Sequence, residues 1–301
     1  MTTLLLVNPA AGGGHGEHAL PEALAAARRA WGDVLVQRTT RAGDATEWGR
    51  RSAEDGVERI IVLGGDGTIH ETANGMLGSG VDADGLPELG IIPIGTGNDF
   101  ARLTGTHGLS SAAAVTRLAG GQRKLFDVGL AWGEYFVNSL GLGFDAVVAS
   151  HVPRYRHLWR SLVYPAAVFR SYRSYRPIQV VVEGDDADYR GGIFCIEVGI
   201  GKSAGGGFFL TPGAEPDDGL FDVCLITPLS HLRFLACMPT AFWGGHTRFR
   251  EVRMSKTGCL TVRSEAPLQA HFDGEVRTGT ETIEIRIVDN RLPVIVVRSE
   301  G

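Results

Sequence analysis

The chain has 301 residues, of which 44% are hydrophobic and 21% charged, so it can bury a substantial core in one large domain or two medium ones. A formal net charge of −5 and a pI near 6.0 argue against a general nucleic-acid binder, because binding to the phosphate backbone normally needs a basic surface. The four cysteines lack paired spacing, and neither a secretory leader nor an apolar stretch of about 20 residues is visible, so we expect a cytoplasmic protein with buried, reduced thiols.

The first third of the chain alternates short apolar runs with helix-like segments. The helix-like segments cover residues 18–29, 44–54 and 69–77. The apolar runs are typical of strands that are buried on both faces, and they lie at residues 4–8, 34–37, 59–65 and 89–95. This alternation predicts a doubly wound α/β domain with a parallel sheet over residues 1–125.

From residue 126 to 291 the pattern changes to short strands without regular helices between them. Such a succession predicts an antiparallel β-sandwich or barrel, so the fold class is α/β plus β. The last apolar run, residues 292–298, either ends this second domain or returns to the first, and the sequence leaves the choice open.

Four strands of the first domain are each followed by a loop of glycine and polar residues, at positions 8–14, 39–44, 64–68 and 95–99. In open parallel sheets, ligands bind outside the carboxyl ends of the strands. We therefore expect all four loops to lie on one rim of the sheet and to form a ligand site there.

The third loop reads Gly64-Gly65-Asp66-Gly67-Thr68 and is followed by a helix. Three glycines let the backbone approach an anion, and the start of the helix directs free N–H groups at the same place, which predicts phosphate binding. Bare phosphate would repel the Asp66 carboxylate, so Asp66 is expected to reach a magnesium ion or to orient a donor. Its alternative role is that of a turn or helix-cap aspartate.

The fourth loop repeats this design, because Thr96 and Asn98 after Gly95 are able to donate hydrogen bonds to phosphate oxygens. Asp99 is expected to cap the helix that begins at Phe100.

Five stretches of the chain together resemble the bacterial diacylglycerol kinase-like lipid kinases: NPAAGGG at 8–14, GGDGTIHE at 64–71, PIGTGNDFAR at 93–102, PGAEPDDGLFDV at 212–223 and FDGE at 272–275. GGDGT alone is shared with NAD kinases and, more loosely, with phosphofructokinases, but the further motifs in this order are more specific. The resemblance spans nearly the whole chain. It implies a phosphofructokinase/NAD kinase-like first domain, a β-sandwich second domain and ATP bound in the cleft between them.

The resemblance also implies roles for individual residues. A magnesium site that supports the active conformation is implied at Glu215, Asp218 and the carbonyl of Leu220, and a general base at Asp273 or Glu275. The implied nucleotide-lining residues are Asn8, Thr39, Gly64, Gly65, Asp66, Gly67, Thr68, Glu71, Gly95, Thr96 and Asn98.

The chemistry of phosphoryl transfer supports some of these assignments without the family. Transfer needs charge neutralisation on the donor and a carboxylate that takes the proton of the acceptor hydroxyl. Asp273 and Glu275 flank a glycine at an expected turn, where they are otherwise merely solvated; Asp273 is our first candidate for the base. Glu215 and Asp218 supply oxygens suited to a hard cation, but they also fit a plain acidic turn.

One stretch departs from the family pattern, because Glu197 and Val198 stand where relatives often have an asparagine-rich segment. This departure leaves the acceptor specificity open.

Residues 151–177 form a basic-aromatic segment with six arginines, no acids and four of the six tyrosines of the chain. Arginines meet anionic head groups and aromatic side chains favour the membrane interface, so the segment predicts peripheral contact with an anionic membrane. The alternative is a helical hairpin whose arginines pair with acids of the other domain. No nucleic-acid motif accompanies the segment.

Taken together, the sequence predicts an ATP- and magnesium-dependent kinase that phosphorylates the hydroxyl of diacylglycerol or a related membrane lipid alcohol. Two alternatives remain: an NAD kinase-type enzyme with a soluble substrate, and a catalytically silent lipid- or nucleotide-binding regulator. A homodimer is compatible with the sequence, which does not determine the oligomeric state.

Overall fold

The computed structural model describes residues 2–151, 168, 170–172 and 175–297. The chain divides into two compact units, one formed by Met1–Val128 with Asp289–Gly301 and the other by Gly129–Val288. Within the described residues, no helix is both long and apolar enough to cross a membrane.

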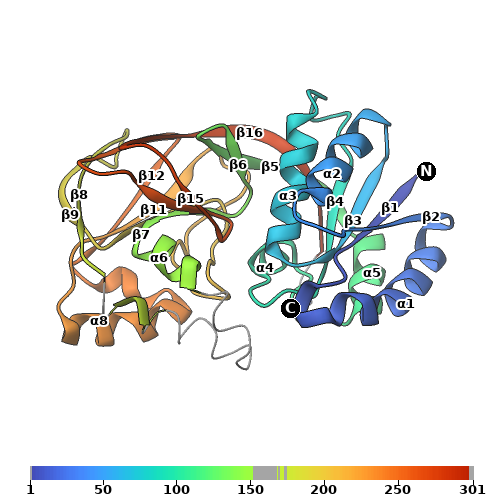
Figure 1. Ribbon diagram of the computed structural model, residues 1–301, viewed down its shortest axis with the longest axis horizontal. Coiled ribbons are helices and arrows are strands. Elements are labelled where there is room, and N and C mark those ends of the chain that lie inside the picture. Colours follow the sequence, from blue (N-terminus) through green and yellow to red (C-terminus); the bar gives the residue numbers. More distant parts are fainter. Residues whose placement is uncertain (1, 152–167, 169, 173–174, 298–301) are drawn as a thin grey trace. The chain divides into compact units, whose positions relative to one another are not determined.

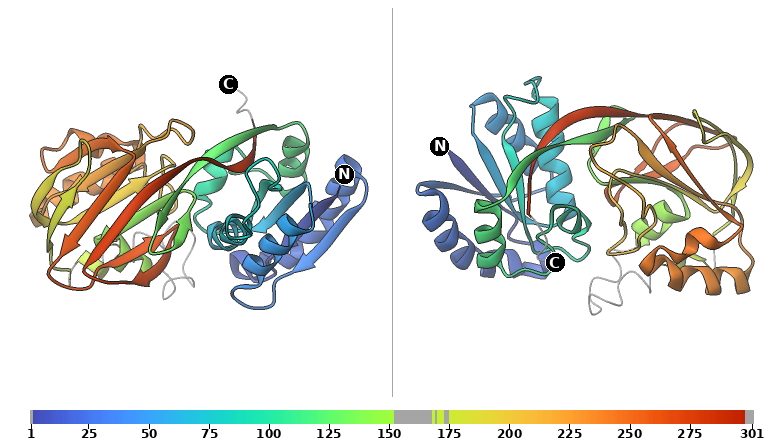
Figure 2. Two further views of the ribbon diagram at one scale, coloured as in Figure 1. Left: turned by 90° about the horizontal axis from the view of Figure 1, so that it is seen from above. Right: turned by 180° about the vertical axis from the view of Figure 1, so that it is seen from behind.

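The first unit is a parallel sheet with helices on both faces (Figure 1). Its strands run in the order β2 (Val34–Arg38), β1 (Thr3–Val7), β3 (Arg59–Gly64) and β4 (Glu88–Pro93), and all neighbours are parallel. The C-terminal part of β16 (Thr282–Val296) continues this order, because Val294 pairs in parallel with Leu89. The last apolar run therefore returns to the first unit, and β16, red in Figure 2, contributes to both units.

Two helices cover each face of this sheet (Figure 1). One face carries α1 (Ala11–Trp31) and α5 (Ser111–Ala119), whose apolar residues pack on Leu5, Ile61 and Ile92. The other face carries α2 (Asp44–Glu54) and α3 (Asp66–Gly78), and a short helix α4 (Asp99–Thr104) follows β4.

Helices α2 and α3 pack with their backbones in contact through two glycines. A Cβ atom added to Gly75 would lie 1.9 Å from the carbonyl oxygen of Thr46, and one added to Gly49 would lie 2.3 Å from that of Thr72. Because real atoms do not approach so closely, any side chain at either position would push the helices apart.

The second unit consists of two β-sheets packed face to face. In one, the first part of β16 lies beside β5 (Gln122–Ala131), which also pairs with β6 (Glu134–Phe136), and beside β13 (Cys259–Ser264), followed by β8 (Ile178–Glu183) and β9 (Tyr189–Ile193). The other is antiparallel throughout, in the order β12 (Val252–Thr257), β11 (Phe221–Ile226), β10 (Cys195–Gly199), β7 (Ser139–Gly143), β14 (Gln269–Phe272) and β15 (Glu275–Thr278).

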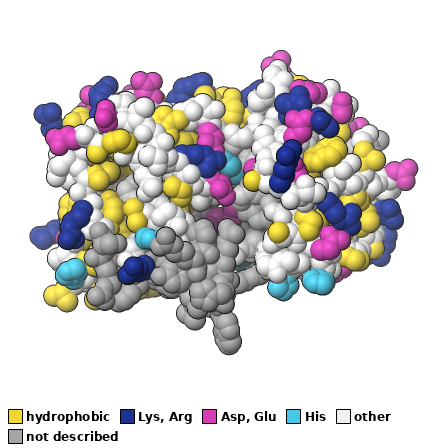
Figure 3. All heavy atoms as spheres, in the orientation of Figure 1, with side chains coloured by type: hydrophobic (Ala, Val, Ile, Leu, Met, Phe, Trp, Pro, Cys, Tyr) yellow, Lys and Arg dark blue, Asp and Glu magenta, His cyan; other side chains and the backbone are white. Residues whose placement is uncertain are grey.

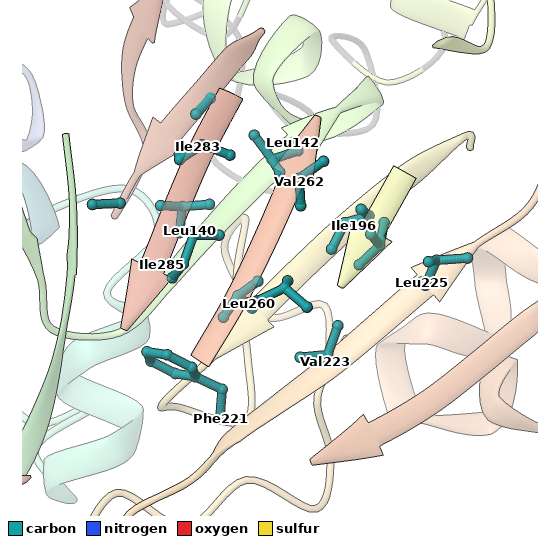
Figure 4. Close-up of a cluster of buried hydrophobic side chains, with 14 of the residues drawn as sticks. Leu140, Leu142, Ile196, Phe221, Val223, Leu225, Leu260, Val262, Ile283 and Ile285 are labelled. Atoms are coloured by element: carbon teal, nitrogen blue, oxygen red, sulfur yellow. The ribbon is translucent and has the colours of Figure 1, made fainter. Parts of the chain in front are cut away.

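The core of the second unit lies between these sheets (Figure 4). Leu140, Leu142 and Ile196 of one sheet meet Val262 and Ile283 of the other, and all are fully buried. Alternate residues along a strand point to opposite faces, so this pattern is that of a sandwich. The predicted fold class, a parallel α/β domain plus an antiparallel β domain, is confirmed.

The outer face of the six-stranded sheet is also covered, which the sequence did not predict. Helices α6 (Phe144–His151) and α8 (His231–Cys237) pack there, and the 3₁₀ helices η2 (Met238–Trp243) and η3 (Gly245–Arg248) follow α8. Phe144, Phe194 and Phe234 form a second apolar cluster on this face. The expectation of strands without regular helices was therefore wrong for this part of the second unit. The expectation of buried thiols was wrong for Cys259, which is exposed, whereas the other three cysteines are buried.

Candidate active site

Two of the glycine-rich loops of the first unit are joined by Asn8, which directly follows β1. Its Nδ2 donates to Oγ1 of Thr68 at 2.9 Å, and its Oδ1 accepts from the backbone N–H of Ala10 at 3.1 Å. Parallel strands β1 and β3 end at the same edge, so the asparagine side chain bridges the first loop to the third.

The third and fourth loops touch through two glycines. A Cβ added to Gly65 would lie 2.9 Å from Cα of Gly95, and one added to Gly95 would lie 2.7 Å from Cα of Gly65. A side chain at either glycine would thus clash with the other loop, and it would also obstruct an anion that approaches the backbone. The first loop differs, since no atom lies within 4 Å of a Cβ added to Gly13 or Gly14, and both glycines adopt the left-handed region instead.

Asp66 holds the fourth loop by capping helix α4. Its Oδ1 accepts from the backbone N–H of Phe100 at 3.1 Å, so Asp66 caps the helix after the fourth loop and not α3, whose N-cap residue is Gly65. Burial, followed by the negative charge of Asp99, raises the pKa of Asp66 to about 7, and backbone donors including Phe100 oppose this rise. Near neutral pH this carboxyl therefore changes charge readily, which is typical of residues at functional sites.

The second loop is fixed by two other carboxylates. Oδ2 of Asp44 accepts from the N–H and the hydroxyl of Thr40 at 2.7 and 2.8 Å, and these bonds, together with those from Arg41, lower the pKa of Asp44 to about 2. Oε2 of Glu71 accepts from the N–H of Gly43 at 3.0 Å. The Glu71 side chain thereby links α3 to the second loop. The sequence predicted a contact of Glu71 with the nucleotide but not this link.

The remaining predicted nucleotide residues lie at the same strand ends. Thr39 donates its N–H to the carbonyl of Val7 at 2.8 Å, and Thr96 is exposed. Asn98 donates from Nδ2 to the carbonyl of Gly95 at 2.9 Å, whereas its Oδ1 is buried without a hydrogen-bond donor among the described residues. The structure thus brings together the loops that carry Asn8, Gly65, Thr68 and Gly95.

Asp273, the first candidate for the base, lies in the second unit at the turn between β14 and β15. Its Oδ1 accepts from the N–H groups of Asn138 and Ser139 at 2.8 and 3.0 Å, and its Oδ2 accepts from that of Val137 at 3.0 Å. A carboxylate has about four acceptor positions, so these bonds anchor the start of β7 and are compatible with a proton-accepting role. Glu275 is exposed at the start of β15.

A buried polar group that the sequence did not predict lies behind this turn. Glu197 of β10 and His271 of β14 both stand opposite Gly141 of the intervening β7. A Cβ on Gly141 would lie 2.2 Å from Nε2 of His271 and 2.6 Å from Oε2 of Glu197, so the glycine makes room for these two atoms to meet at 3.5 Å. His271 also accepts at Nδ1 from the N–H of Gly274, at 3.3 Å.

The ionisation of this group is perturbed by its burial. Burial, with the charge of Glu197 next in importance, raises the pKa of Asp145 on α6 to about 7. Burial opposes the positive charge of His271, but Glu197, Asp145 and Asp273 together outweigh it and raise the pKa of the imidazole. The lone acid Glu197 within the apolar strand run was the one signal of this group that the sequence offered.

The residues expected to hold magnesium are arranged around a lysine. Asp218 accepts from the N–H of Leu220 at 3.1 Å and from Nζ of Lys256 at 2.7 Å, and the same ammonium lies 3.2 Å from Oδ2 of Asp222. Burial and then the charges of Asp218 and Glu215 raise the pKa of Asp222, although Lys256 opposes the rise. Among the described residues, no three acidic, histidine or cysteine side chains form a metal-binding cluster. A magnesium site made of Glu215, Asp218 and the carbonyl of Leu220 stays a prediction, and Lys256 supplies the positive charge beside Asp218 in this structure.

The basic-aromatic segment falls largely on residues 152–167, 169 and 173–174, which lie outside the described residues. Its described end packs on α8, where the ring of Tyr172 stacks on Phe234 with centroids 3.8 Å apart. On the face shown in Figure 3, basic and acidic side chains are interspersed.

Comparisons with known proteins agree with this fold. The family model "Diacylglycerol kinase catalytic domain" matches residues 2–131, and "YegS C-terminal NAD kinase beta sandwich-like domain" matches residues 138–296. A diacylglycerol kinase of Bacillus subtilis is 30% identical over 272 residues, which cover 90% of this chain and 88% of that protein. A probable lipid kinase YegS-like of Pseudomonas fluorescens is 34% identical and covers 88% of each chain.

Solved structures give the same answer. A putative diacylglycerol kinase from Bacillus anthracis superimposes with a TM-score of 0.80 at 25% identity, over 98% of this chain and 96% of that one. An NAD kinase from Archaeoglobus fulgidus in complex with ATP has a TM-score of 0.54 at 17% identity over 100% and 94% of the two chains, and this shows a similar fold alone. The chain therefore belongs to the bacterial family of diacylglycerol kinase-like and YegS-like lipid kinases.

Proposed function

We propose that the protein transfers the terminal phosphoryl group of ATP to the hydroxyl of a membrane lipid, with diacylglycerol as the first candidate and phosphatidic acid as its product. Family membership supports lipid kinase activity, and the relatives named diacylglycerol kinases support this acceptor. Related lipid alcohols, such as phosphatidylglycerol, ceramide or a sphingoid base, remain candidates for the acceptor.

The observation that carries the proposal is the contact among three glycine-rich loops at one edge of the parallel sheet. Asn8 bridges the first and third loops, and the backbones of Gly65 and Gly95 touch. At the start of α3, free N–H groups and the positive end of the helix dipole favour the phosphates of a nucleotide. Gly64, Gly67 and Thr68 belong to the same cradle.

The acceptor hydroxyl must lose its proton as the new bond to phosphorus forms. In this proposal Asp273 accepts that proton, because backbone donors hold its carboxylate in place, and Glu275 of the same turn is the alternative. Magnesium, when it arrives with the nucleotide, supplies charge neutralisation at the phosphates. Asp66 fixes the fourth loop through α4 and changes its own charge near neutral pH.

The proposed enzyme works in the cytoplasm and meets its substrate at the membrane surface. The arginines of residues 151–177 favour contact with anionic head groups. An NAD kinase-type activity is supported by the common fold alone.

Radiolabelled ATP, incubated with mixed bacterial lipids and separately with NAD, tests the proposal. We expect label in a lipid product that extracts into organic solvent. Label in NAD would contradict a lipid acceptor, and measurable ATP binding without transfer to either acceptor would favour a regulator.

A further inference from the structure

Helix α8 and the following η2 expose large apolar side chains instead of polar ones. The exposed fractions are 80% for Leu232, 59% for Leu235 and 68% for Trp243, and Phe242 is also exposed. Phe234 on the inner side of α8 is buried, so the helix is apolar on both sides. A surface helix normally carries polar residues on its outer side, and apolar clusters of this kind mark interaction sites.

The charges around this patch indicate what covers it. Residues 228–250 contain Arg233, Arg248 and Arg250 but no aspartate or glutamate, in a chain whose net charge is −5. The one acid next to this stretch, Glu251, pairs with Arg233 at 2.6 Å and with Arg250 at 3.3 Å. In Figure 3, hydrophobic, histidine and basic side chains lie next to one another at the lower left, over α8.

The arginine-rich segment 151–177 ends against the same helix. Tyr172 stacks on Phe234, and its ring centroid lies 5.3 Å from that of His231. Leucine and tryptophan beside arginine is the composition of surfaces that enter the interface of an anionic bilayer. The single acid Glu251 is paired with Arg233 and Arg250, so it adds no unpaired negative charge here.

We infer that Leu232, Leu235, Phe242 and Trp243 form the surface by which the protein docks on an anionic membrane. This inference rests on the proposed function, because it names the place where the enzyme meets the lipid phase that contains its acceptor. The apolar side chains enter the interface, and the exposed Arg248 contacts the head groups.

Co-sedimentation with vesicles, carried out without ATP, tests this surface. The double variant Leu232→Ser, Leu235→Ser should bind vesicles of phosphatidylcholine and phosphatidylglycerol at least about tenfold more weakly than the wild type. Leu35→Ser is the matched control, because Leu35 is 57% exposed on β2 of the first unit, and it should bind as the wild type does. Arg248→Gln should weaken binding to these vesicles only at low salt.

Equal binding by the double variant and the wild type would overturn the inference. So would a change from dimer to monomer in the double variant with unchanged vesicle binding, because the patch would then be covered by a second copy of the chain. Turnover of a water-dispersed short-chain diacylglycerol should survive in the double variant. If the wild type also failed to phosphorylate the short-chain diacylglycerol, that result would count against the proposed function and not against the docking surface.

An independent observation concerns the buried group of Asp145, Glu197 and His271. Both carboxylate oxygens of Glu197 and Oδ2 of Asp145 lack a hydrogen-bond donor among the described residues, apart from the 3.5 Å contact with His271. Burial and then the charge of Glu197 raise the pKa of Asp145 to about 7, so a proton on Asp145 removes one of two neighbouring negative charges. Burial also raises the pKa values of Cys195, Cys224 and Tyr175, which keeps these neighbours neutral.

The bonds of His271 define its tautomer. Nδ1 accepts from the N–H of Gly274, so this nitrogen carries no proton, and Nε2–H points to Glu197. A second proton on the ring would turn Nδ1 into a donor, and the bond to Gly274 would be lost. This bond lies in the turn that bears Asp273 and Glu275.

We propose that Asp145 and Glu197, through His271, position the Asp273–Glu275 turn for the reaction. They are positioning residues, because His271 contacts the backbone of the turn and not the substrate. Glu197 holds the imidazole in the tautomer that accepts from Gly274, and a proton on Asp145 limits the negative charge beside it.

Two substitutions of His271 separate its two nitrogens. His271→Asn keeps an acceptor near the position of Nδ1, whereas His271→Gln keeps a donor near Nε2 and loses that acceptor. We expect kcat to fall at least about tenfold more in His271→Gln than in His271→Asn, with the KM for ATP unchanged in both. The opposite order, or equal losses, would contradict the positioning role.

The substitution Glu197→Gln tests the effect of the Glu197 carboxylate charge on His271. The amide is able to accept from Nε2–H and donate to Asp145, but it carries no charge, so the pKa of His271 should fall and the acid limb of kcat should move to lower pH. Nitrogen NMR of His271 measures the protonation of the imidazole without any turnover. This test is therefore valid even if the substrate is not a lipid. An unprotonated Nε2, or an unchanged titration in Glu197→Gln, would overturn the proposal.

Discussion

The substitution Asp66→Asn should change the pH dependence of stability in a defined way. The pKa of Asp66 is raised from 3.8 to about 7 in the folded protein by burial and by Asp99. The unfolded chain therefore releases this proton first, and the folded state loses stability as the pH rises through the interval between these two values. A shift of about three units corresponds to about 4 kcal/mol in full, and to about 3 kcal/mol between about pH 5 and about pH 8.

Asparagine removes the ionisation and keeps an acceptor for the N–H of Phe100. The free energy of unfolding of Asp66→Asn, relative to the wild type, should rise by about 3 kcal/mol over that pH range, whatever constant amount the amide loses at α4. Urea denaturation at several pH values, in EDTA and without nucleotide, measures this difference. Kinase turnover of the same variant should fall by orders of magnitude. A stability difference that does not depend on pH would refute the assignment of a raised pKa to Asp66.

Three further predictions concern the packing of α2 on α3, Lys256 and the general base. Gly75→Ala should destabilise the protein by about 1–3 kcal/mol in urea denaturation, because its Cβ would lie 1.9 Å from the carbonyl oxygen of Thr46. Gly78→Ala on the same helix, where no atom lies within 4 Å of the added Cβ, should be neutral or stabilising, and equal losses in both variants would contradict the backbone contact of the two helices. Lys256→Met should lower the melting temperature and make it rise with added magnesium, since Asp218 and Asp222 would lose their counter-charge, and a magnesium response equal to that of the wild type would contradict this role. Asp273→Asn should lower kcat by orders of magnitude while Glu275→Gln does not, and the reverse order would reassign the base to Glu275.

Much of the fold was predictable because its strands are buried on both faces. Residues 4–7, 60–63 and 89–92 include no polar side chain that would mark an exposed side, and this is typical of a central parallel sheet. The close packing of α2 on α3 was not predictable, since Gly49 and Gly75 look like weak helix residues until their neighbours are known. The helices on the outer face of the second unit escaped prediction because α8 is apolar on both sides and lacks the usual helical periodicity.

The site was predictable where function depends on backbone, and less so where it depends on charge. Glycines that permit close approach are visible in the sequence, and Gly65 and Gly95 do touch. The partners of a carboxylate are not visible, because they come from distant parts of the chain: Lys256 reaches Asp218 across 38 positions, and the amides around Asp273 lie more than 130 positions earlier. The binding of ATP in a cleft between the two domains stays a prediction, as does the role of Asp273 as the general base.

The central claim is that this chain is a lipid kinase, and the most direct measurement is transfer of the terminal phosphate of ATP to diacylglycerol in mixed micelles. The purified protein should form labelled phosphatidic acid, identified by thin-layer chromatography, and Asp66→Ala should form it at a rate lower by orders of magnitude. No labelled lipid from diacylglycerol or from any other lipid alcohol, with NAD phosphorylated under the same conditions, would contradict the claim.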